Sequence, residues 1–219
     1  MVDGKEKLKM TNIYLAPIKC NCCDTMGLFE RIDRVDAVYS PELISSISDW
    51  EFFKFSCSEC GNQALIEYPT IFHDENNLVI VQYSPKKDST IIKAQILSLI
   101  SEGIDISKYQ IRVVSDMEEF IEKVQIFSEG FDDRAIELMK YLKSPKEIDD
   151  IQFTYDYMVF TKVGDIRYQF MFVRSQDVVA SLEFDRELYD ECYSEIRDVD
   201  IDLCYINEVW AEEFVRNGI

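Results

Sequence analysis

The sequence predicts an α+β fold in two successive parts. Three observations support this: β-rich segments with two C-x-x-C pairs fill the first part, helical periodicity marks the middle, and a second β-rich stretch followed by two helices ends the chain. The length of 219 residues suits one large domain or two smaller ones. We predict a flexible N-terminal arm over residues 1–12, a first domain over 13–145 and a C-terminal α+β subdomain over 146–219.

The first part is predicted to be mainly β-structure, from residue 13 to about residue 85. Its strand candidates are rich in β-branched and aromatic side chains and are separated by turn residues. They are Tyr14-Leu15 and residues 51–56, 64–68 and 78–83. Asn76-Asn77 is expected to form a hairpin turn, because asparagine tolerates positive φ. Ser40-Pro41 is expected to open a short helix.

The middle of the chain is predicted to be helical. Apolar side chains recur at helical spacing over residues 89–101 and again over residues 116–128. Gly130 is expected to end the second of these helices, because glycine readily adopts the left-handed conformation found just past a helix. Asp132 or Asp133 is expected to cap a third helix.

The last part is predicted to be a β-meander followed by two helices. Its three strand candidates are residues 152–161, 166–173 and 178–184, and short turns between them indicate antiparallel pairing. The apolar faces of the two helices are predicted to consist of Leu188, Tyr189, Cys192 and Ile196 in the first, and Ile206, Val209, Trp210 and Phe214 in the second.

The chain is strongly acidic, since 42 Asp and Glu against 23 Lys and Arg give a formal net charge of −19. Residues 111–219 hold 26 of these acids and only 12 basic residues. Such a charge repels phosphate backbones and anionic membrane surfaces, so we expect neither nucleic acid nor a membrane as partner. The expected partner is a protein, and the charge favours a basic one.

The sequence favours a cytoplasmic location. No apolar stretch reaches the ~18 residues of a membrane-spanning helix, and no signal-peptide-like segment follows the N-terminus. The chain has seven cysteines, and an odd number that includes two C-x-x-C pairs suits a reducing compartment better than a disulfide framework.

The four cysteines of the two C-x-x-C pairs, Cys20 with Cys23 and Cys57 with Cys60, are the candidate metal ligands. Two intervening residues let a tight turn direct both sulfurs at one ion, and N–H groups of the turn can stabilise the thiolates. Gly61 provides the backbone freedom that such a turn needs after its last ligand. Four thiolates complete the tetrahedral set of one structural Zn²⁺, so the first part is predicted to contain a zinc-ribbon-like antiparallel β unit. A redox dithiol is the main alternative.

Three further features could carry chemistry. Cys22 lies inside the first pair and is expected to be a spare thiol, although the sequence leaves open whether it replaces a neighbour as ligand. His73, the single histidine, could act as an acid–base group, but a structural position at a strand end is expected. A third feature is a charged group made of Asp132, Asp133, Arg134 and Glu137. It could bind a metal or a phosphoryl group, but we expect it to cap a helix and form ion pairs.

Both cysteine pairs and the segments around them resemble the CpXC domain, a bacterial and archaeal domain named for paired Cys-Pro-x-Cys motifs. The resemblance extends over about residues 15–143, with weaker similarity through Trp210. It is carried by the two cysteine pairs and by residues 50–55, 68–69, 72–74, 83–85, 112–114, 131–134 and 137–138. Asn21 and Ser58 stand where the family has proline, which preorganises the turn but is not a ligand. The resemblance implies a zinc-binding fold and no particular biochemical activity.

These observations favour a zinc-stabilised cytoplasmic protein-binding module. One alternative is an acidic immunity or antitoxin protein that neutralises a basic toxin. Another is an enzyme that uses His73 or the cysteine thiols. The chain has no nucleotide-binding or hydrolase motif and no complete catalytic constellation, so an enzyme is the less favoured class.

Overall fold

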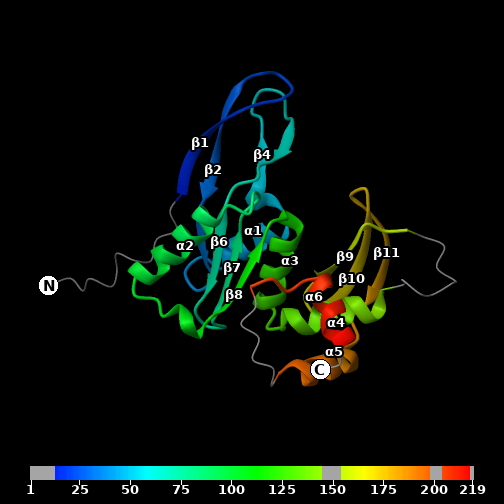
Figure 1. The fold of residues 1–219 in the computed structure, drawn as a ribbon. Coiled ribbons are helices and arrows are strands. Elements are labelled where there is room, and N and C mark those ends of the chain that lie inside the picture. Colours follow the sequence, from blue (N-terminus) through cyan, green and yellow to red (C-terminus); the bar gives the residue numbers. More distant parts are fainter. Residues whose placement is uncertain (1–12, 145–153, 198–203, 218–219) are drawn as a thin grey trace. The chain divides into compact units, whose positions relative to one another are not determined.

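The computed structural model describes residues 13–144, 154–197 and 204–217. The chain divides into two compact units, with the boundary between Val124 and Gln125 inside helix α3 (Met117–Ser128) (Figure 1). The predicted arm over residues 1–12 lies outside the described residues. So does the predicted domain boundary at 145–146, which stays a prediction.

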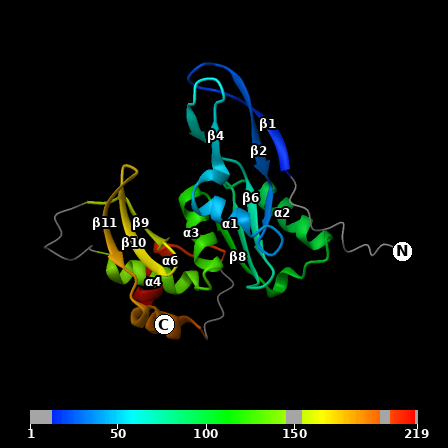
Figure 2. The ribbon, with the colours of Figure 1, turned by 180° about the vertical axis from the view of Figure 1, so that it is seen from behind.

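The first unit contains two separate β-ribbons and a four-stranded sheet. One ribbon pairs β1 (Ile13–Lys19) with β2 (Met26–Ile32), and the other pairs β4 (Lys54–Ser56) with β5 (Gln63–Leu65). The sheet has the order β3-β6-β7-β8. Its strands are β3 (Arg34–Asp36), β6 (Thr70–Asp74), β7 (Val79–Tyr83) and β8 (Gln110–Val114). Both ribbons extend away from this sheet, and their turns lie side by side (Figures 1 and 2).

The α+β class is confirmed, and the two ribbons that hold the cysteine pairs are antiparallel, whereas the four-stranded sheet is mixed. β6 and β7 pair antiparallel, whereas β3 with β6 and β7 with β8 pair parallel. Parallel neighbours need a long crossover connection. Between β7 and β8 this connection contains the predicted helix, α2 (Ser89–Ser101), together with the short 3-10 helix η3 (Ile106–Lys108).

The sheet is buried on both faces. β6 and β7 are buried at every position. On one face Ile71 and Ile80 pack against Leu99 of α2. On the other face the ring of Tyr83 stacks on Phe120 of α3, with centroids 5.6 Å apart.

Residues 51–56 form a strand only in their second half, which corrects the predicted strand. Helix α1 (Glu42–Ser48) follows Ser40-Pro41 as expected, and a 3-10 helix, η2 (Glu51–Phe53), then precedes β4. Trp50 enters η2 with a φ of 65°. Phe53 is fully buried and contacts the rings of Tyr68 and Tyr83, so tertiary packing overrides the β-propensity of this segment.

The turn between β6 and β7 lies where it was predicted, but its left-handed residue differs. The carboxylate of Asp74 accepts hydrogen bonds from the backbone N–H groups of Asn76 and Asn77 at 2.9 and 3.1 Å. Positive φ falls on Leu78, at 54°, rather than on either asparagine. The asparagines therefore serve the turn through their hydrogen bonds to Asp74.

The second unit packs helices against the predicted meander. The sheet order is β11-β10-β9, and both pairs are antiparallel. The strands are β9 (Tyr157–Val163), β10 (Arg167–Arg174) and β11 (Asp177–Glu183); the helices are α4 (Asp133–Lys143), α5 (Arg186–Ile196) and α6 (Glu208–Asn217). Residues 152 and 153 of the predicted first strand, 152–161, lie outside the described residues.

One aromatic-rich core holds the second unit together. The ring of Phe131 contacts Phe160 and Tyr189, and α4 packs against both α5 and α6. The predicted apolar face of α6 is correct for Trp210 and Phe214, which are buried, but not for Val209, which is 61% exposed. Among the described residues, no helix is both long enough and apolar enough to cross a bilayer.

Candidate metal centre

Each C-x-x-C pair occupies the turn of one β-ribbon. Cys20 follows β1 and Cys57 follows β4, so two short ribbons present two cysteines each. The two turns share the same hydrogen bonding. The N–H of Cys20 donates to the carbonyl of Thr25, and the N–H of Cys57 donates to the carbonyl of Asn62, both at 2.9 Å. The two turns are therefore local copies of one backbone geometry.

Both turns also contain a left-handed residue directly after the second cysteine. Gly61 has a φ of 72°, as the sequence led us to expect, and its N–H donates to the carbonyl of Cys57. Asp24 takes the same place in the first turn with a φ of 59°, and its N–H donates to the carbonyl of Cys20. Aspartate is one of the few residues other than glycine that adopt this conformation readily.

The four predicted sulfur atoms lie together. The Sγ atoms of Cys20 and Cys60 are 3.6 Å apart, as are those of Cys23 and Cys57, and all four lie within 4.8 Å of one another. A tetrahedral site with metal–sulfur bonds of about 2.3 Å has sulfur–sulfur edges of about 3.8 Å. The cluster therefore fits a metal ion. Of the residues described, this is the one group of ligand-type side chains placed to hold a metal.

Both short sulfur contacts join one turn to the other, so the cluster links the two ribbons. A second link lies beside it, where β2 passes close to β4. A Cβ atom added at Gly27 would lie 2.7 Å from the ring of Phe55, so only glycine fits here without displacing that ring. Cys20 and Cys57 are buried at this junction, while Cys23 and Cys60 are exposed.

Cys22 lies outside the cluster and is exposed. Its backbone N–H contacts the sulfur of Cys20 at 3.4 Å. Hydrogen bonds from the backbone of Cys23 and Cys22 hold the pKa of the Cys20 thiol below its usual value. Cys22 thus supports the cluster through its main chain rather than through its thiol.

The thiols of the cluster differ in acidity. Hydrogen bonds from Thr25, first from its side chain and then from its backbone, lower the pKa of Cys23 to about 6. A backbone hydrogen bond from Asn62 lowers the pKa of Cys60, but hydrogen bonds with the neighbouring thiols, Cys23 first, together with burial outweigh it and raise this pKa to about 12. A divalent cation at the centre would displace the protons that the sulfurs otherwise share, so metal binding would release protons.

His73 is the second-to-last residue of β6, close to the strand end where it was expected. The side chain is only 2% exposed. Its Nδ1 lies 2.9 Å from a carboxylate oxygen of Asp36 in β3, and its Nε2 lies 3.1 Å from the hydroxyl of Tyr109. Burial raises the pKa of Asp36, but the hydrogen bond from His73 and the charge of Arg34 outweigh it and hold that pKa below its usual range. The imidazole therefore belongs to a buried polar network that joins β3 to β6.

The charged group at residues 132–137 caps α4 and forms an ion pair there, as expected. The carboxylate of Asp132 accepts a hydrogen bond from the backbone N–H of Arg134 at 2.9 Å, which caps the helix. The guanidinium of Arg134 pairs with the same carboxylate at 2.8 Å. Asp133 and Glu137 are buried on the helix.

Comparison with known families supports the resemblance noted in the sequence. The family described as CpXC protein matches residues 18–140, more than half of the chain. The chain belongs to the CpXC family. The match includes both cysteine turns and continues through most of α4, past the boundary between the two units. No curated protein and no solved structure matches this CpXC chain.

The first prediction separates Cys22 from its neighbour. We expect Cys23→Ser to lose bound metal or bind it far more weakly, because its sulfur belongs to the cluster. Cys22→Ser should keep metal content and melting temperature close to those of the wild type. Elemental analysis and thermal unfolding of protein purified without added metal measure both effects. Metal loss in Cys22→Ser with retention in Cys23→Ser would reverse the assignment.

The second prediction concerns Asp36. Because the folded-state pKa of Asp36 is lowered, its ionised form stabilises the fold; this contribution is complete above the usual aspartate pKa of about 3.9 and is lost as pH falls through the folded value. Asp36→Asn should therefore lower the free energy of unfolding at pH 7 by about 1–3 kcal/mol. The difference from the wild type should shrink as the pH falls below about 4.

Urea unfolding of the wild type and Asp36→Asn at a series of pH values measures this difference. Metal release in acid affects both proteins, so the difference isolates Asp36. Glu183→Gln, which alters an exposed carboxylate on β11, should have little effect at any pH. A difference for Asp36→Asn that stays constant between pH 7 and pH 3 would attribute the loss to packing rather than charge.

Proposed function

We propose that this CpXC protein is a zinc-stabilised protein-binding module of the cytoplasm, in which one structural Zn²⁺ is held by Cys20, Cys23, Cys57 and Cys60. The ion would supply a cross-link between the β1–β2 and β4–β5 ribbons and no reaction chemistry. Four sulfurs complete a closed tetrahedral set, which is typical of structural rather than catalytic zinc. The separation of the sulfurs supports this assignment, because it matches a tetrahedron of thiolates.

The observation that carries the binding function is an exposed apolar face on the β1–β2 ribbon. Residues directly opposite each other in an antiparallel pair share one face. On the inner face Ala16 lies opposite Phe29, which is buried. The outer face displays large apolar side chains, which are Ile13, Leu15, Met26 and Leu28 at 56, 61, 59 and 66% exposure. Glu30 and Lys19 lie on the same face, opposite Leu15 and Met26, and exposed apolar side chains bordered by polar ones are typical of interaction sites on soluble proteins.

The charge of the chain selects the kind of partner. Two copies that each carry −19 repel each other, so self-association through this face is disfavoured. A basic protein is attracted instead, and such a partner would cover the outer face of the ribbon with apolar contacts. The immunity-protein hypothesis is one case of a basic partner. The buried position of His73 gives no support to the enzyme alternative.

The third prediction tests the ribbon face. A photo-crosslinking residue at position 28 should capture one defined protein from native lysate, whereas the same residue at position 97 should not. Leu97 is the matched control, since it is 62% exposed but lies on α2. Once purified, that protein should bind the wild type at least about tenfold more tightly than Leu15→Asp/Leu28→Asp, and Leu97→Asp should bind like the wild type.

Removal of zinc should weaken the same binding, because the ribbon would lose its cross-link. Equal capture from positions 28 and 97 would contradict the proposal. So would full binding by Leu15→Asp/Leu28→Asp.

A further inference from the structure

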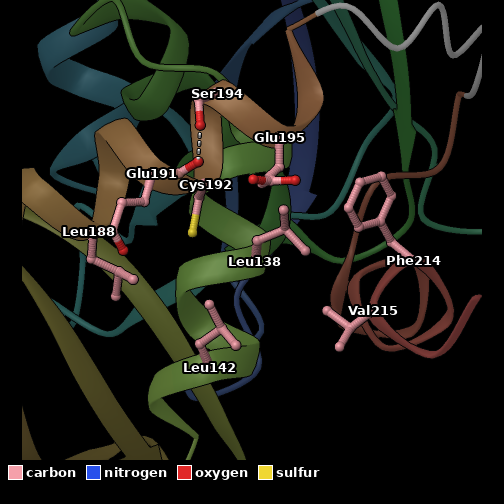
Figure 3. A pocket seen from close by; sticks show the side chains of 9 residues that line it. All are labelled: Leu138, Leu142, Leu188, Glu191, Cys192, Ser194, Glu195, Phe214 and Val215. Carbon is pink, nitrogen blue, oxygen red and sulfur yellow. Dashed lines mark hydrogen bonds between the residues drawn. The ribbon is translucent and has the colours of Figure 1, made fainter. Parts of the chain in front are cut away.

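The second unit contains an apolar groove that neither the metal centre nor the ribbon explains. Its volume is about 440 Å³, and it lies among α4, α5 and α6 (Figure 3). We call it the α4–α6 groove. The residues that line it are Leu138, Leu142, Leu188, Glu191, Cys192, Ser194, Glu195, Phe214 and Val215.

One stripe of α5 forms a wall of the groove. Leu188, Glu191, Cys192 and Glu195 occupy positions i, i+3, i+4 and i+7, so they share a helix face. Cys192 is buried. Burial, together with the charges of Glu191 and Glu195, raises the pKa of the Cys192 thiol to about 11. This thiol is therefore neutral at physiological pH and contributes apolar surface.

The rim of the groove is open. Leu142 of α4 is 54% exposed and Val215 of α6 is 43% exposed, while Leu138 and Phe214 beneath them are buried. Figure 3 shows the α4 leucines between the side chains of α5 and those of α6. A small-molecule site usually encloses most of its ligand. An open groove with exposed leucine and valine at its edge is better suited to the apolar face of an amphipathic helix.

Two carboxylates give the groove its charge. Glu191 and Glu195 are both exposed, and neither forms an ion pair within the described part of the chain. Two arginines of these helices pair with acids outside the groove: Arg186 of α5 with Asp190 at 3.2 Å and Arg216 of α6 with Glu212 at 2.7 Å. An occupant with positive charge beside its apolar face would therefore meet two unpaired acids.

We propose that the α4–α6 groove binds a basic amphipathic helix of a partner protein. The apolar side chains of this helix would contact Leu138, Leu142 and Phe214, and its Lys or Arg side chains would lie beside Glu191 and Glu195. This goes beyond the proposed function, because the groove is a second site in the other unit and requires neither zinc nor the ribbon. The acid surplus of residues 111–219 would accelerate the encounter.

A designed peptide tests the groove directly on the full chain. The probe is a labelled helical peptide with leucines at i, i+3, i+4 and i+7 and lysines on both flanks. A second peptide keeps the leucines and replaces every lysine with glutamate. Fluorescence anisotropy at low and at physiological ionic strength should show binding of the lysine peptide, weakened by salt, and at least about tenfold weaker binding of the glutamate peptide.

Surface variants locate the binding. Glu191→Lys/Glu195→Lys should weaken the lysine peptide about tenfold at low salt, and Leu142→Asp should also weaken it. Asp177→Lys/Glu183→Lys on β11 makes the same charge change away from the groove and is the matched control. It should bind much like the wild type, and so should Leu15→Asp/Leu28→Asp. All these positions are exposed, and circular dichroism verifies that each variant is folded.

Four outcomes would overturn the proposal. They are the absence of peptide binding, equal binding of both peptides, full binding by Leu142→Asp, and equal loss in the groove variant and the β11 control. Loss in Leu15→Asp/Leu28→Asp alone would place the peptide on the ribbon instead. Because the ribbon is tested with different variants and a different partner, either proposal can fail without the other.

Discussion

The first unit depends on bringing four thiols from two separate β-turns to one point. Among the described residues, the β1–β2 and β4–β5 ribbons share no strand pairing with each other or with the four-stranded sheet. A two-stranded ribbon is marginally stable by itself in water. The contacts between the sulfurs of Cys20 and Cys60 and of Cys23 and Cys57 both connect one ribbon to the other. With a metal ion at the centre, these contacts would become a cross-link between two ribbons that also meet where the ring of Phe55 lies close to Gly27.

This arrangement explains how the ribbon can display apolar side chains. A strand pair usually gains its stability by burying one face, and here Phe29 supplies that burial on the inner side. A metal cross-link at its turn would fix the ribbon without requiring burial of the outer face. Leu15 and Leu28, which are exposed, would then be available to a partner. In the second unit a dense aromatic core plays the stabilising role instead, and it leaves the α4–α6 groove open at its edge.

Features encoded by short sequence patterns were predictable. The spacing of Cys20/Cys23 and Cys57/Cys60 predicted which thiols gather, and Gly61 predicted the left-handed residue of the second turn. The periodicity of residues 89–101 predicted α2, and Asp132 predicted the cap of α4. Each of these predictions rests on a pattern within a few residues, although the two cysteine turns themselves come from distant parts of the chain.

Features that depend on distant partners were not predictable. The five residues of β8 have no strong pattern of their own, and they become a strand because β7 offers them a parallel edge. His73 lies near a strand end as expected, but its contacts with Asp36 and Tyr109, which lie far from it in the sequence, could not be read from its neighbours. The groove likewise arises only when three helices pack together, and a single helix pattern such as that of α5 contains no sign of it.

The central claim is that four cysteine sulfurs hold one structural zinc ion. X-ray absorption at the zinc edge, on protein purified without added metal, tests it most directly. The account predicts one zinc per chain with four sulfur neighbours at about 2.3 Å and no nitrogen or oxygen ligand. A zinc shell that contains nitrogen or oxygen, or protein that holds no zinc and has its C-x-x-C pairs oxidised to disulfides, would contradict it.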